Sequence, residues 1–249
     1  MRLEGKIAII TGGGSGFGEG IARRFVSEGA RVVVAGRDTA ALERVAAPLG
    51  NNARAIRADV TKEADIAAMV AATIKEFGTL DILVNNAGVP QPPQPCDSVP
   101  EELFDNIFAV NAKAIYLAAR HVVPIFKKAR AGNILNIAST GGVSPRPNLT
   151  WYNASKGWAI TATRAMAVEL APFGIRVNAI NPVAGETPML KAFMGGTETP
   201  EARARFISTI PLGRFSTAED VANTAAFLCS DEASMITGVA LEVDGGRCI

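Results

Sequence analysis

The chain has 249 residues with 25 basic and 24 acidic side chains, a formal net charge of +1 that creates no field to attract nucleic acid or an anionic membrane. Its single histidine, His121, leaves almost no histidine for a Ser-His-Asp hydrolase or a multi-histidine metal centre, and its three separated cysteines argue against a zinc site. No targeting or membrane-spanning segment fits the start of the chain, so we expect a cytoplasmic protein without metal, nucleic-acid or membrane partners.

Predicted strands and helices alternate along the chain. Short apolar runs predict seven strands, at residues 6–10, 31–36, 53–59, 80–88, 132–140, 175–182 and 239–246. Apolar residues at helical spacing predict seven helices. The first follows the glycine-rich segment and ends near residue 29, the next five cover residues 39–49, 62–77, about 101–111, 111 to about 129, and 152–171, and the last follows residue 216 and runs through 228. This alternation predicts a single domain over residues 1–249, an α/β fold with a doubly wound, Rossmann-like seven-stranded parallel sheet and helices on both faces.

Polar residues mark where several of these helices begin. Asp38 is placed to cap the second helix. Ser98 with Glu101, and Ser216 with Glu219, have the spacing of a capping box, in which each side chain bonds the other residue's backbone N–H. We therefore expect helices to begin directly after residues 98 and 216.

Two segments do not fit the alternation. Residues 89–101 contain five prolines and predict a stiff loop at the rim of the sheet. Residues 187–210 are irregular, and paired glycines break them into short amphipathic pieces with Phe193, Met194 and Phe206 as candidate pocket walls. We expect this second segment to form a substrate lid.

The letters TGGGSGFG follow directly after the first strand and open the first helix. Gly12, Gly16 and Gly18 lie where the backbone must turn tightly, admit a pyrophosphate and pack the helix on the strand, with Ser15 and Phe17 between them. A glycine loop in this context predicts a dinucleotide site.

The ends of the second and third strands predict which dinucleotide binds. An enzyme selective for NAD usually offers a carboxylate to the adenosine ribose at the end of the second strand, but Gly36 has no side chain and Arg37 offers a guanidinium. Arg37 would pair with a ribose 2′-phosphate, which favours NADP(H) and leaves NAD(H) possible. Asp59 and Val60 at the end of the third strand are candidates for holding the adenine.

Tyr152 and Lys156 lie four residues apart in the predicted helix 152–171 and so share one face of it. A lysine cation beside a phenol favours the phenolate, which would bring the phenol closer to proton transfer at neutral pH. The pair is therefore a candidate acid/base site.

The chain resembles the single-domain short-chain dehydrogenases/reductases of about 250 residues. The resemblance covers essentially the whole chain and rests on motifs in the family's order: TGGGSGFG at 11–18, Asp59-Val60, NNAG at 85–88, Asn111, Ser139, YNASK at 152–156 and Thr187.

The resemblance implies a role for each of four catalytic residues. Tyr152 would be the general acid/base, and Ser139 would orient and stabilise the substrate oxygen. Lys156 would hold the nicotinamide ribose and favour the phenolate, and Asn111 would support a water chain that passes the proton from Lys156 to solvent. Thr187 would hydrogen-bond the carboxamide and fix the ring face that delivers hydride.

The same resemblance, together with the strand-end positions, defines the predicted cofactor site, in which the NNAG segment forms the wall beside adenine and nicotinamide ribose. Its residues are Gly12, Ser15, Gly16, Phe17, Gly18, Arg37, Asp59, Val60, Asn86, Ala87, Gly88, Tyr152, Lys156 and Thr187.

The sequence departs from the family pattern after the sixth strand, where Val183 follows Pro182 in place of the usual glycine. Valine lacks the freedom of glycine at positive φ, which puts the local backbone and any cofactor contact at Val183 and Gly185 in question. Glu186 beside the pocket would meet either a polar substrate or only solvent.

We predict an NADP(H)-dependent oxidoreductase that interconverts a small-molecule ketone or aldehyde and an alcohol, as a 3-oxoacyl reductase or carbonyl reductase does. The alternative is an NAD-dependent sugar, polyol or secondary-alcohol dehydrogenase, and from another class a non-catalytic NADP-sensing scaffold. The resemblance also implies a homotetramer, with the apolar helices 111–129 and 152–171 and the last strand packing against partner subunits.

Overall fold

The computed structural model describes residues 1–249 and contains one sheet of seven strands in the order β3-β2-β1-β4-β5-β6-β7. Every neighbouring pair is parallel. The strands are β1 (Ile7–Thr11), β2 (Arg31–Gly36), β3 (Ala53–Arg57), β4 (Ile82–Asn85), β5 (Gly132–Ile137), β6 (Ile175–Pro182) and β7 (Ala240–Val243). The strand order reverses between β1 and β4, so the predicted doubly wound fold is confirmed.

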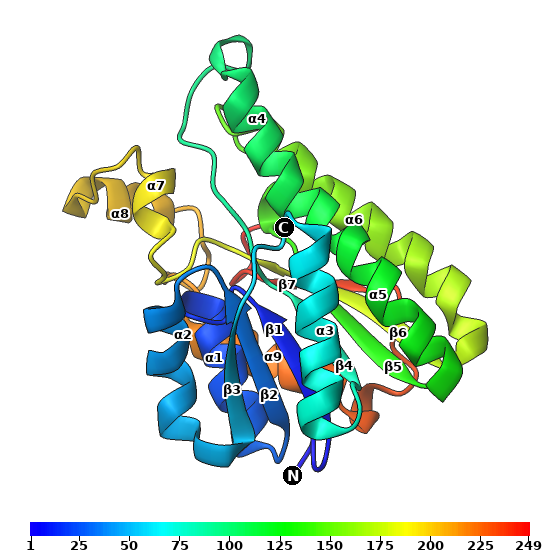
Figure 1. Cartoon of the computed structure of the whole chain (residues 1–249). Helices are drawn as coiled ribbons and strands as arrows, with labels where there is room; N and C mark the ends of the chain where they lie inside the picture. Colours follow the sequence, from blue (N-terminus) through cyan, green and yellow to red (C-terminus); the bar gives the residue numbers. More distant parts are fainter.

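Helices cover both faces of this sheet (Figure 1). Helices α1, α2 and α9 pack on one face, and α3, α5 and α6 pack on the other. The helices are α1 (Gly16–Ser27), α2 (Thr39–Ala46), α3 (Glu63–Phe77), α4 (Glu101–Phe108), α5 (Ala114–Ala129), α6 (Thr150–Leu170), α7 (Leu190–Phe193), α8 (Pro200–Ile207) and α9 (Ala218–Cys229).

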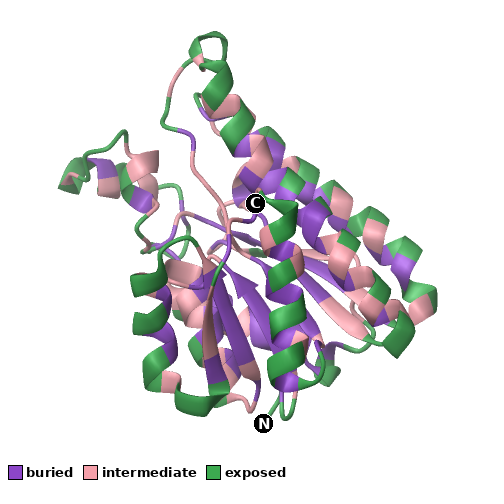
Figure 2. Ribbon diagram, in the orientation of Figure 1, coloured by how far each residue is buried: buried purple, intermediate pink, exposed green.

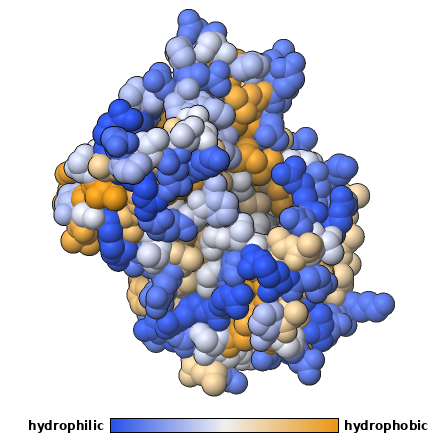
Figure 3. Space-filling model, turned by 90° about the vertical axis from the view of Figure 1, so that its left-hand side faces the viewer, coloured by the Kyte–Doolittle hydropathy of each residue, from blue (hydrophilic) through white to orange (hydrophobic).

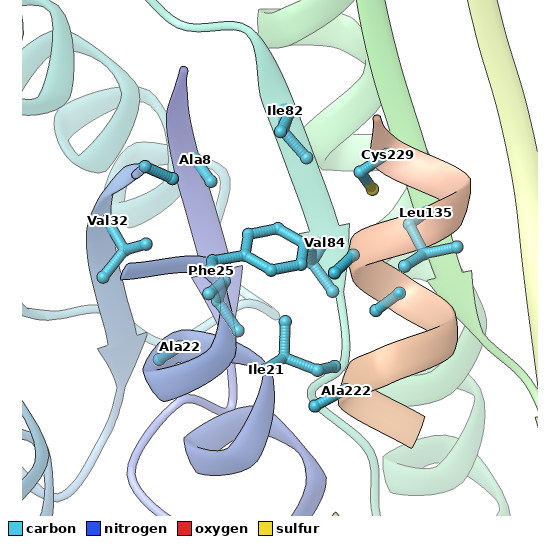
Figure 4. Close-up of a cluster of buried hydrophobic side chains, with 14 of the residues drawn as sticks. Ala8, Ile21, Ala22, Phe25, Val32, Ile82, Val84, Leu135, Ala222 and Cys229 are labelled. Atoms are coloured by element: carbon cyan, nitrogen blue, oxygen red, sulfur yellow. The ribbon is translucent and has the colours of Figure 1, made fainter. Parts of the chain in front are cut away.

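The central strands consist mainly of apolar residues because both of their faces are covered. All five residues of β1 are buried, and Figure 2 shows the buried strands between helices whose outer faces are exposed. On one face Phe25 and Ile21 of α1 meet Ala222 of α9 over the side chains of Val84 and Leu135 (Figure 4). Burial of these side chains fixes the strands, and therefore the positions of the loops at their carboxyl ends.

Both predicted capping boxes are wrong. The box of α9 is formed by Thr217 and Asp220, one residue later than expected, because the Ser216 hydroxyl donates to the carbonyl of Val183 at 3.2 Å. Helix α4 has no side-chain cap, and the Ser98 hydroxyl donates instead to Pro95 within the preceding turn at 2.9 Å. In both cases a tertiary or turn contact takes the serine that local spacing assigns to the helix.

The two helices predicted on either side of Asn111 form one continuous rod. Helix α4 passes into α5 through a π-helical turn at Ala109–Lys113. Such single wide turns occur frequently at functional sites, and this one carries a residue of the predicted catalytic set.

Helices α7 and α8 form the predicted lid region beyond the carboxyl end of β6, apart from the main body of the molecule (Figure 1). On the side of the molecule where α2 and these helices face the viewer, hydrophobic residues form limited patches in a mainly hydrophilic surface (Figure 3). No helix combines the length and the apolar character needed to cross a membrane.

Candidate active site

A cavity of about 450 Å³ lies at the carboxyl ends of the strands, where ligands bind in sheets of this kind. It is bounded by the strand ends, the start of α6 and the lid helices α7 and α8. The predicted site residues that line it are Gly12, Ser15, Gly16, Phe17, Asn86, Ala87, Gly88, Ser139, Tyr152, Lys156 and Thr187. The structure therefore brings most of the predicted cofactor and catalytic residues to one cavity.

The glycine loop leaves no room for side chains. A Cβ on Gly12, whose φ is +64°, would lie 2.9 Å from the Cα of Ala87, and one on Gly18 would lie 2.3 Å from the Gly12 carbonyl oxygen. Gly18 is buried behind the loop and does not line the cavity. A backbone this bare at a helix N-terminus fits a pyrophosphate, whose oxygens need close approach to N–H groups.

Hydrogen bonds join this loop to the NNAG segment. The Thr11 hydroxyl accepts from the backbone N–H groups of Asn86 and Ala87 at 3.0 and 3.1 Å. The Asn86 amide donates to the carbonyls of Thr11 and Gly12 at 2.9 and 3.1 Å. The ends of β1 and β4 are thus fixed against each other, and the floor of the cavity is rigid before any ligand binds.

Residues after β6 complete this end of the cavity. A Cβ on Gly16 would lie 3.1 Å from Thr187 Cγ2, and one on Gly185 would lie 2.4 Å from the ring of Phe17. The glycine loop and the loop after β6 therefore pack directly against each other at this end of the cavity.

Val183 adopts no strained backbone, because the only non-glycine residues at positive φ are Arg130 and Asn148. Its side chain is buried in a small cluster with Leu190 and Phe215 and lines the cavity. The side chain of Val183, where the family usually has glycine, thus packs the loop after β6 against Leu190 of the lid helix α7.

Tyr152 and Lys156 are both buried on the face of α6 that meets the cavity. The Lys156 ammonium lies 5.9 Å from the centre of the Tyr152 ring and donates to the carbonyl of Ile137 at 2.8 Å. Burial lowers the pKa of Lys156 to about 8, because water no longer stabilises its charge.

Burial also raises the pKa of Tyr152 to about 12, with a hydrogen bond to Ser139 acting in the opposite direction. Burial is the larger of these two effects, so the pKa lies above its ordinary value. The expectation that Lys156 favours the phenolate stays a prediction. A phenol that stays protonated at neutral pH is suited to donating a proton.

Ser139 lies two residues beyond the end of β5, and its oxygen accepts from the N–H of Gly141 at 3.0 Å. A Cβ on Gly141 would lie 3.4 Å from that oxygen and 3.5 Å from Cε1 of Tyr152. The serine and tyrosine thus adjoin on the same wall of the cavity.

Asn111 does not line the cavity, and its side chain is buried in the π-helical turn. Its oxygen accepts from the N–H of Val89 at 2.8 Å, and its amide donates to the Val89 carbonyl and the Ser155 hydroxyl, each at 3.1 Å. Asn111 therefore ties the segment after β4 to α6. Its predicted part in a water chain stays a prediction.

Besides Gly18, three predicted cofactor residues lie outside the cavity lining. Arg37 is exposed and makes no hydrogen bond or ion pair, and Val60 is buried against Val110 and Ala114. The carboxylate of Asp59 accepts from the N–H and the hydroxyl of Thr61 at 3.0 and 2.8 Å. Burial by itself would raise the pKa of Asp59, but these hydrogen bonds and the charge of Arg37 lower the pKa below its ordinary value. These residues surround the ends of β2 and β3, farther along the sheet than the cavity.

Sequence reasoning missed the residue that fixes the start of α6. Gln91 is fully buried, and its oxygen accepts from the backbone N–H groups of Trp151 and Tyr152, each at 3.1 Å. Its amide donates to the carbonyl of Asn148 at 3.0 Å. Because α6 has no cap of its own, Gln91 serves as its cap from a distant loop. Only its place inside the proline-rich segment marks it in the sequence.

The substrate side also differs in part from expectation. Met194, a candidate pocket wall, does not line the cavity. Trp151 does not line it either, and its indole donates to the carbonyl of Cys96 at 3.1 Å. Phe193 and Phe206 of the lid do line the cavity, and the Phe193 ring lies 5.0 Å from that of Tyr152. Arg146, which the sequence did not single out, lines the cavity as well. No three histidine, cysteine, aspartate or glutamate side chains cluster as a metal site.

Comparison with known proteins supports a nicotinamide-dependent site. A family model described as enoyl-(acyl carrier protein) reductase matches residues 12–247. The chain is 48% identical, over 100% of both chains, to the 4-formylbenzenesulfonate dehydrogenase TsaC1/TsaC2 of Comamonas testosteroni.

Two solved structures share the whole fold. One is a 3-ketoacyl-(acyl-carrier-protein) reductase from Brucella melitensis complexed with NADH, which is 54% identical with a TM-score of 0.95 over 99% of this chain and 100% of that one. The other is an NAD⁺-bound xylitol dehydrogenase, which is 30% identical with a TM-score of 0.93 over the same shares.

Proposed function

Since the chain belongs to the short-chain dehydrogenase/reductase family and is an NAD(P)-dependent oxidoreductase acting on alcohol and carbonyl groups, we propose that Tyr152 is its general acid/base and that its substrate is a small ketone, aldehyde or alcohol. The observation that carries this proposal is the cavity itself. It joins a bare glycine loop to a buried tyrosine, serine and lysine at the carboxyl edge of one sheet.

A bound nicotinamide cofactor would supply hydride to the carbonyl carbon, or accept it from the alcohol. The glycine loop and the NNAG segment would hold the cofactor, with Lys156 binding its ribose and Thr187 its carboxamide. Ser139 donates to the substrate oxygen and stabilises the negative charge that develops there. Tyr152 gives its phenol proton to that oxygen in reduction and takes it back in oxidation.

The buried environment favours the reductive proton transfer. Because burial raises the pKa of Tyr152 to about 12, the phenol carries its proton at pH 7 and is ready to donate it. In the opposite direction Tyr152 must first lose that proton, so alcohol oxidation is expected to rise with pH. The neutral form of Lys156, whose pKa burial lowers to about 8, offers a nearby acceptor.

Substitution of Tyr152 by phenylalanine tests the proposal. The ring and its packing against Phe193 remain, so the change removes only the hydroxyl. We expect kcat to fall by about 10²- to 10⁴-fold in a panel of ketones, aldehydes and alcohols followed at the NAD(P)H absorbance, with the cofactor Kd within about 3-fold of wild type. Turnover equal to that of wild type would remove Tyr152 from the mechanism.

For the cofactor we propose a preference for NADP(H). Strand β2 ends at Gly36 and is followed by Arg37, whose side chain has no protein partner. The carboxylate of Asp38 caps α2 by accepting from the backbone N–H of Ala41 at 3.1 Å. A free guanidinium suits a ribose 2′-phosphate. The alternative, NAD(H), is favoured by the cofactors bound in the two similar structures.

Kinetics with both reduced cofactors decide between the alternatives. In Arg37→Ala we expect kcat/KM for NADPH to fall by about 10-fold and that for NADH to stay within about 2-fold. Arg57→Ala, which removes a nearby exposed arginine at the end of β3, is the matched control. If wild type prefers NADH, or if Arg37→Ala affects both cofactors alike, the alternative replaces our proposal.

We also propose a homotetramer. Large apolar side chains are exposed on the elements that would meet partner subunits, with Tyr116 on α5, Trp158 and Val168 on α6 and Leu241 on the edge strand β7. Light scattering at micromolar concentration should give four times the chain mass of 26.0 kDa. A monomer would contradict the proposal. The cytoplasmic location stays a prediction from the sequence.

A further inference from the structure

The charges that face the cavity are all positive. Its lining contains two charged side chains, Lys156 and Arg146, and no aspartate or glutamate. Lys156 lies beside Tyr152 and is bonded to the Ile137 carbonyl, where the proposed mechanism already uses it. Arg146 has no part in that mechanism, so its position in the cavity needs another explanation.

Arg146 is held firmly in place. It stands between Pro145 and Pro147, which restrict its backbone, and its carbonyl accepts from the Asn153 amide at 2.8 Å. Its guanidinium lies 4.8 Å from the centre of the Phe206 ring and donates to the Thr209 hydroxyl at 2.6 Å. The arginine thus spans from the loop before α6 to the end of the lid helix α8.

No carboxylate neutralises this guanidinium. Arg146 takes part in no ion pair, and the bond to Thr209 is the only hydrogen bond of a side chain that carries five N–H donors.

A second arginine adds to the positive charge. Arg247, near the end of the chain, donates to the Ser144 hydroxyl at 2.9 Å and likewise has no carboxylate partner. Burial, and then the charge of Arg247, lower the pKa of Arg146 below its usual range, although an arginine stays charged at neutral pH. A partly buried cation without a counter-ion is costly unless a ligand brings one.

We propose that Arg146 is a specificity-determining residue that binds a carboxylate or sulfonate of the substrate, at a position separate from the reacting carbonyl. The substrate class is then a small ketone or aldehyde, or the matching alcohol, that carries such an anion. A guanidinium offers paired N–H donors that match the planar oxygens of a carboxylate or two oxygens of a sulfonate. The apolar rings of Phe193 and Phe206 would contact the part of the substrate between its two polar ends.

This inference rests on the proposed function, since it names the substrate of the same site. The reacting bonds are unchanged: hydride still adds to the carbonyl carbon and the Tyr152 proton to its oxygen, while the anion only holds the substrate in place. Binding and chemistry therefore make separate predictions.

Paired substrates that differ only in the anion test the inference. Reduction of 4-formylbenzoate and of 4-formylbenzenesulfonate is compared with that of benzaldehyde, which lacks the charge. In Arg146→Gln we expect kcat/KM for one or both anionic aldehydes to fall by about 10- to 100-fold more than that for benzaldehyde. Arg146→Lys should restore part of this ratio, because it keeps the charge and loses the paired donors.

Arg205→Gln is the matched control. It removes an exposed arginine from the lid helix α8, and Arg205 does not line the cavity. The ratio of anionic to neutral substrate should stay within about 2-fold of wild type in this variant. The inference is overturned if Arg146→Gln leaves the ratio unchanged, or lowers kcat/KM for benzaldehyde as much as for the anions. The second result would mark Arg146 as purely structural.

Equilibrium binding separates failure of the inference from failure of the proposed function. Titration calorimetry with benzoate and benzenesulfonate should show binding to the wild-type protein with cofactor present, weakened about 10-fold or more in Arg146→Gln. If no aldehyde or alcohol is turned over, the proposed function fails while this binding still supports the anion site. If turnover occurs but neither anion depends on Arg146, the inference fails alone.

Discussion

The two sides of the cavity satisfy their polar groups in different ways. The strand-end side comprises the glycine loop, the NNAG segment and the start of α6. There the side chains of Asn86 and Lys156 are fixed by hydrogen bonds to backbone carbonyls, and a Cβ at Gly12 or Gly18 would clash with neighbouring atoms. On the lid side, α7 and α8 line the cavity mainly with apolar side chains. The lid is held by the ion pairs of Arg203 with Glu186 and Glu198, which are partly exposed.

From this difference we infer that the strand-end side serves the reaction steps common to all substrates, and that the lid side determines which substrate binds. In the proposed mechanism, fixed dipoles on the strand ends would hold the cofactor and the reacting oxygen without reorganisation, as electrostatic stabilisation requires. A lid with few buried polar bonds can change its side chains without disturbing that arrangement. Changes on the strand-end side should therefore impair turnover of every substrate, and changes on the lid side should alter the choice among substrates.

The largest effect is expected from Gly18→Ala on the strand-end side. The new Cβ would lie 2.3 Å from the Gly12 carbonyl oxygen, a backbone atom that moves only if the loop moves. We expect the cofactor Kd to rise by about 100-fold and the unfolding free energy to fall by about 1–3 kcal/mol, measured by fluorescence titration and urea unfolding. Gly157→Ala in α6 is the control, because its Cβ meets only one atom, at 3.8 Å. Cofactor affinity preserved in Gly18→Ala would show that this side is less rigid than we infer.

The next effect concerns the charge buried on this side. Burial lowers the pKa of Lys156 to about 8, so the unfolded chain holds this proton more tightly than the folded one between pH 8 and 10. Stability from this group is therefore present above the unfolded pKa and is lost as pH falls through 8. Relative to Lys156→Met, wild type should gain about 2 kcal/mol of unfolding free energy from pH 8 to pH 10.

Urea unfolding at several pH values measures this gain. The unpaired Ile137 carbonyl in Lys156→Met adds a constant offset, so only the change with pH is used. Lys75→Met, which removes an exposed lysine from α3, controls for the loss of a surface charge. A difference between wild type and Lys156→Met that does not vary with pH would argue against a buried, desolvated ammonium.

The strand-end side was largely predictable from the sequence, whereas on the lid side the sequence indicated the pocket walls Phe193 and Phe206 but not Arg146. The seven strands, the glycine loop and the spacing of Tyr152 and Lys156 are local patterns, which periodicity and motif reveal directly. The capping boxes failed by local ambiguity, because Ser216 and Thr217 are adjacent candidates and only the contact of Ser216 with Val183 decides between them.

The missed residues act across long separations in the chain. Gln91 bonds residues about sixty positions away, and Arg146 reaches Thr209 over 63 positions. The burial that raises the pKa of Tyr152 was missed for a similar reason, since it depends in part on Phe193 of α7, which packs against the Tyr152 ring. Tertiary placement, which no single window of sequence contains, determines these features.

Gln91 fixes the start of α6, which carries Tyr152, and its substitution should have an intermediate effect. Gln91→Leu keeps the approximate size but removes the acceptor for the N–H groups of Trp151 and Tyr152, so the first turn of α6 loses its cap. We expect the unfolding free energy to fall by about 1–2 kcal/mol and kcat to fall by about 10-fold for anionic and neutral aldehydes alike. Gln91→Glu retains the acceptor and should keep more of kcat. Loss confined to one substrate would assign Gln91 to the lid side instead.

The smallest effect is expected from the ion pairs of the lid. Arg203 of α8 forms ion pairs with Glu186, which follows β6, and with Glu198, and Arg203→Gln removes both. Ion pairs at the surface contribute less than about 1 kcal/mol to the free energy of unfolding. The unfolding free energy should therefore change little, while a looser lid raises KM by about 2- to 5-fold with kcat nearly unchanged, since binding but not proton transfer depends on the lid. Arg205→Gln removes an arginine of the same helix that has no ion pair, and it should leave KM at the wild-type value. A fall in kcat with unchanged KM in Arg203→Gln would mean that the lid positions reacting groups, and the division between a chemical side and a selective side would not hold.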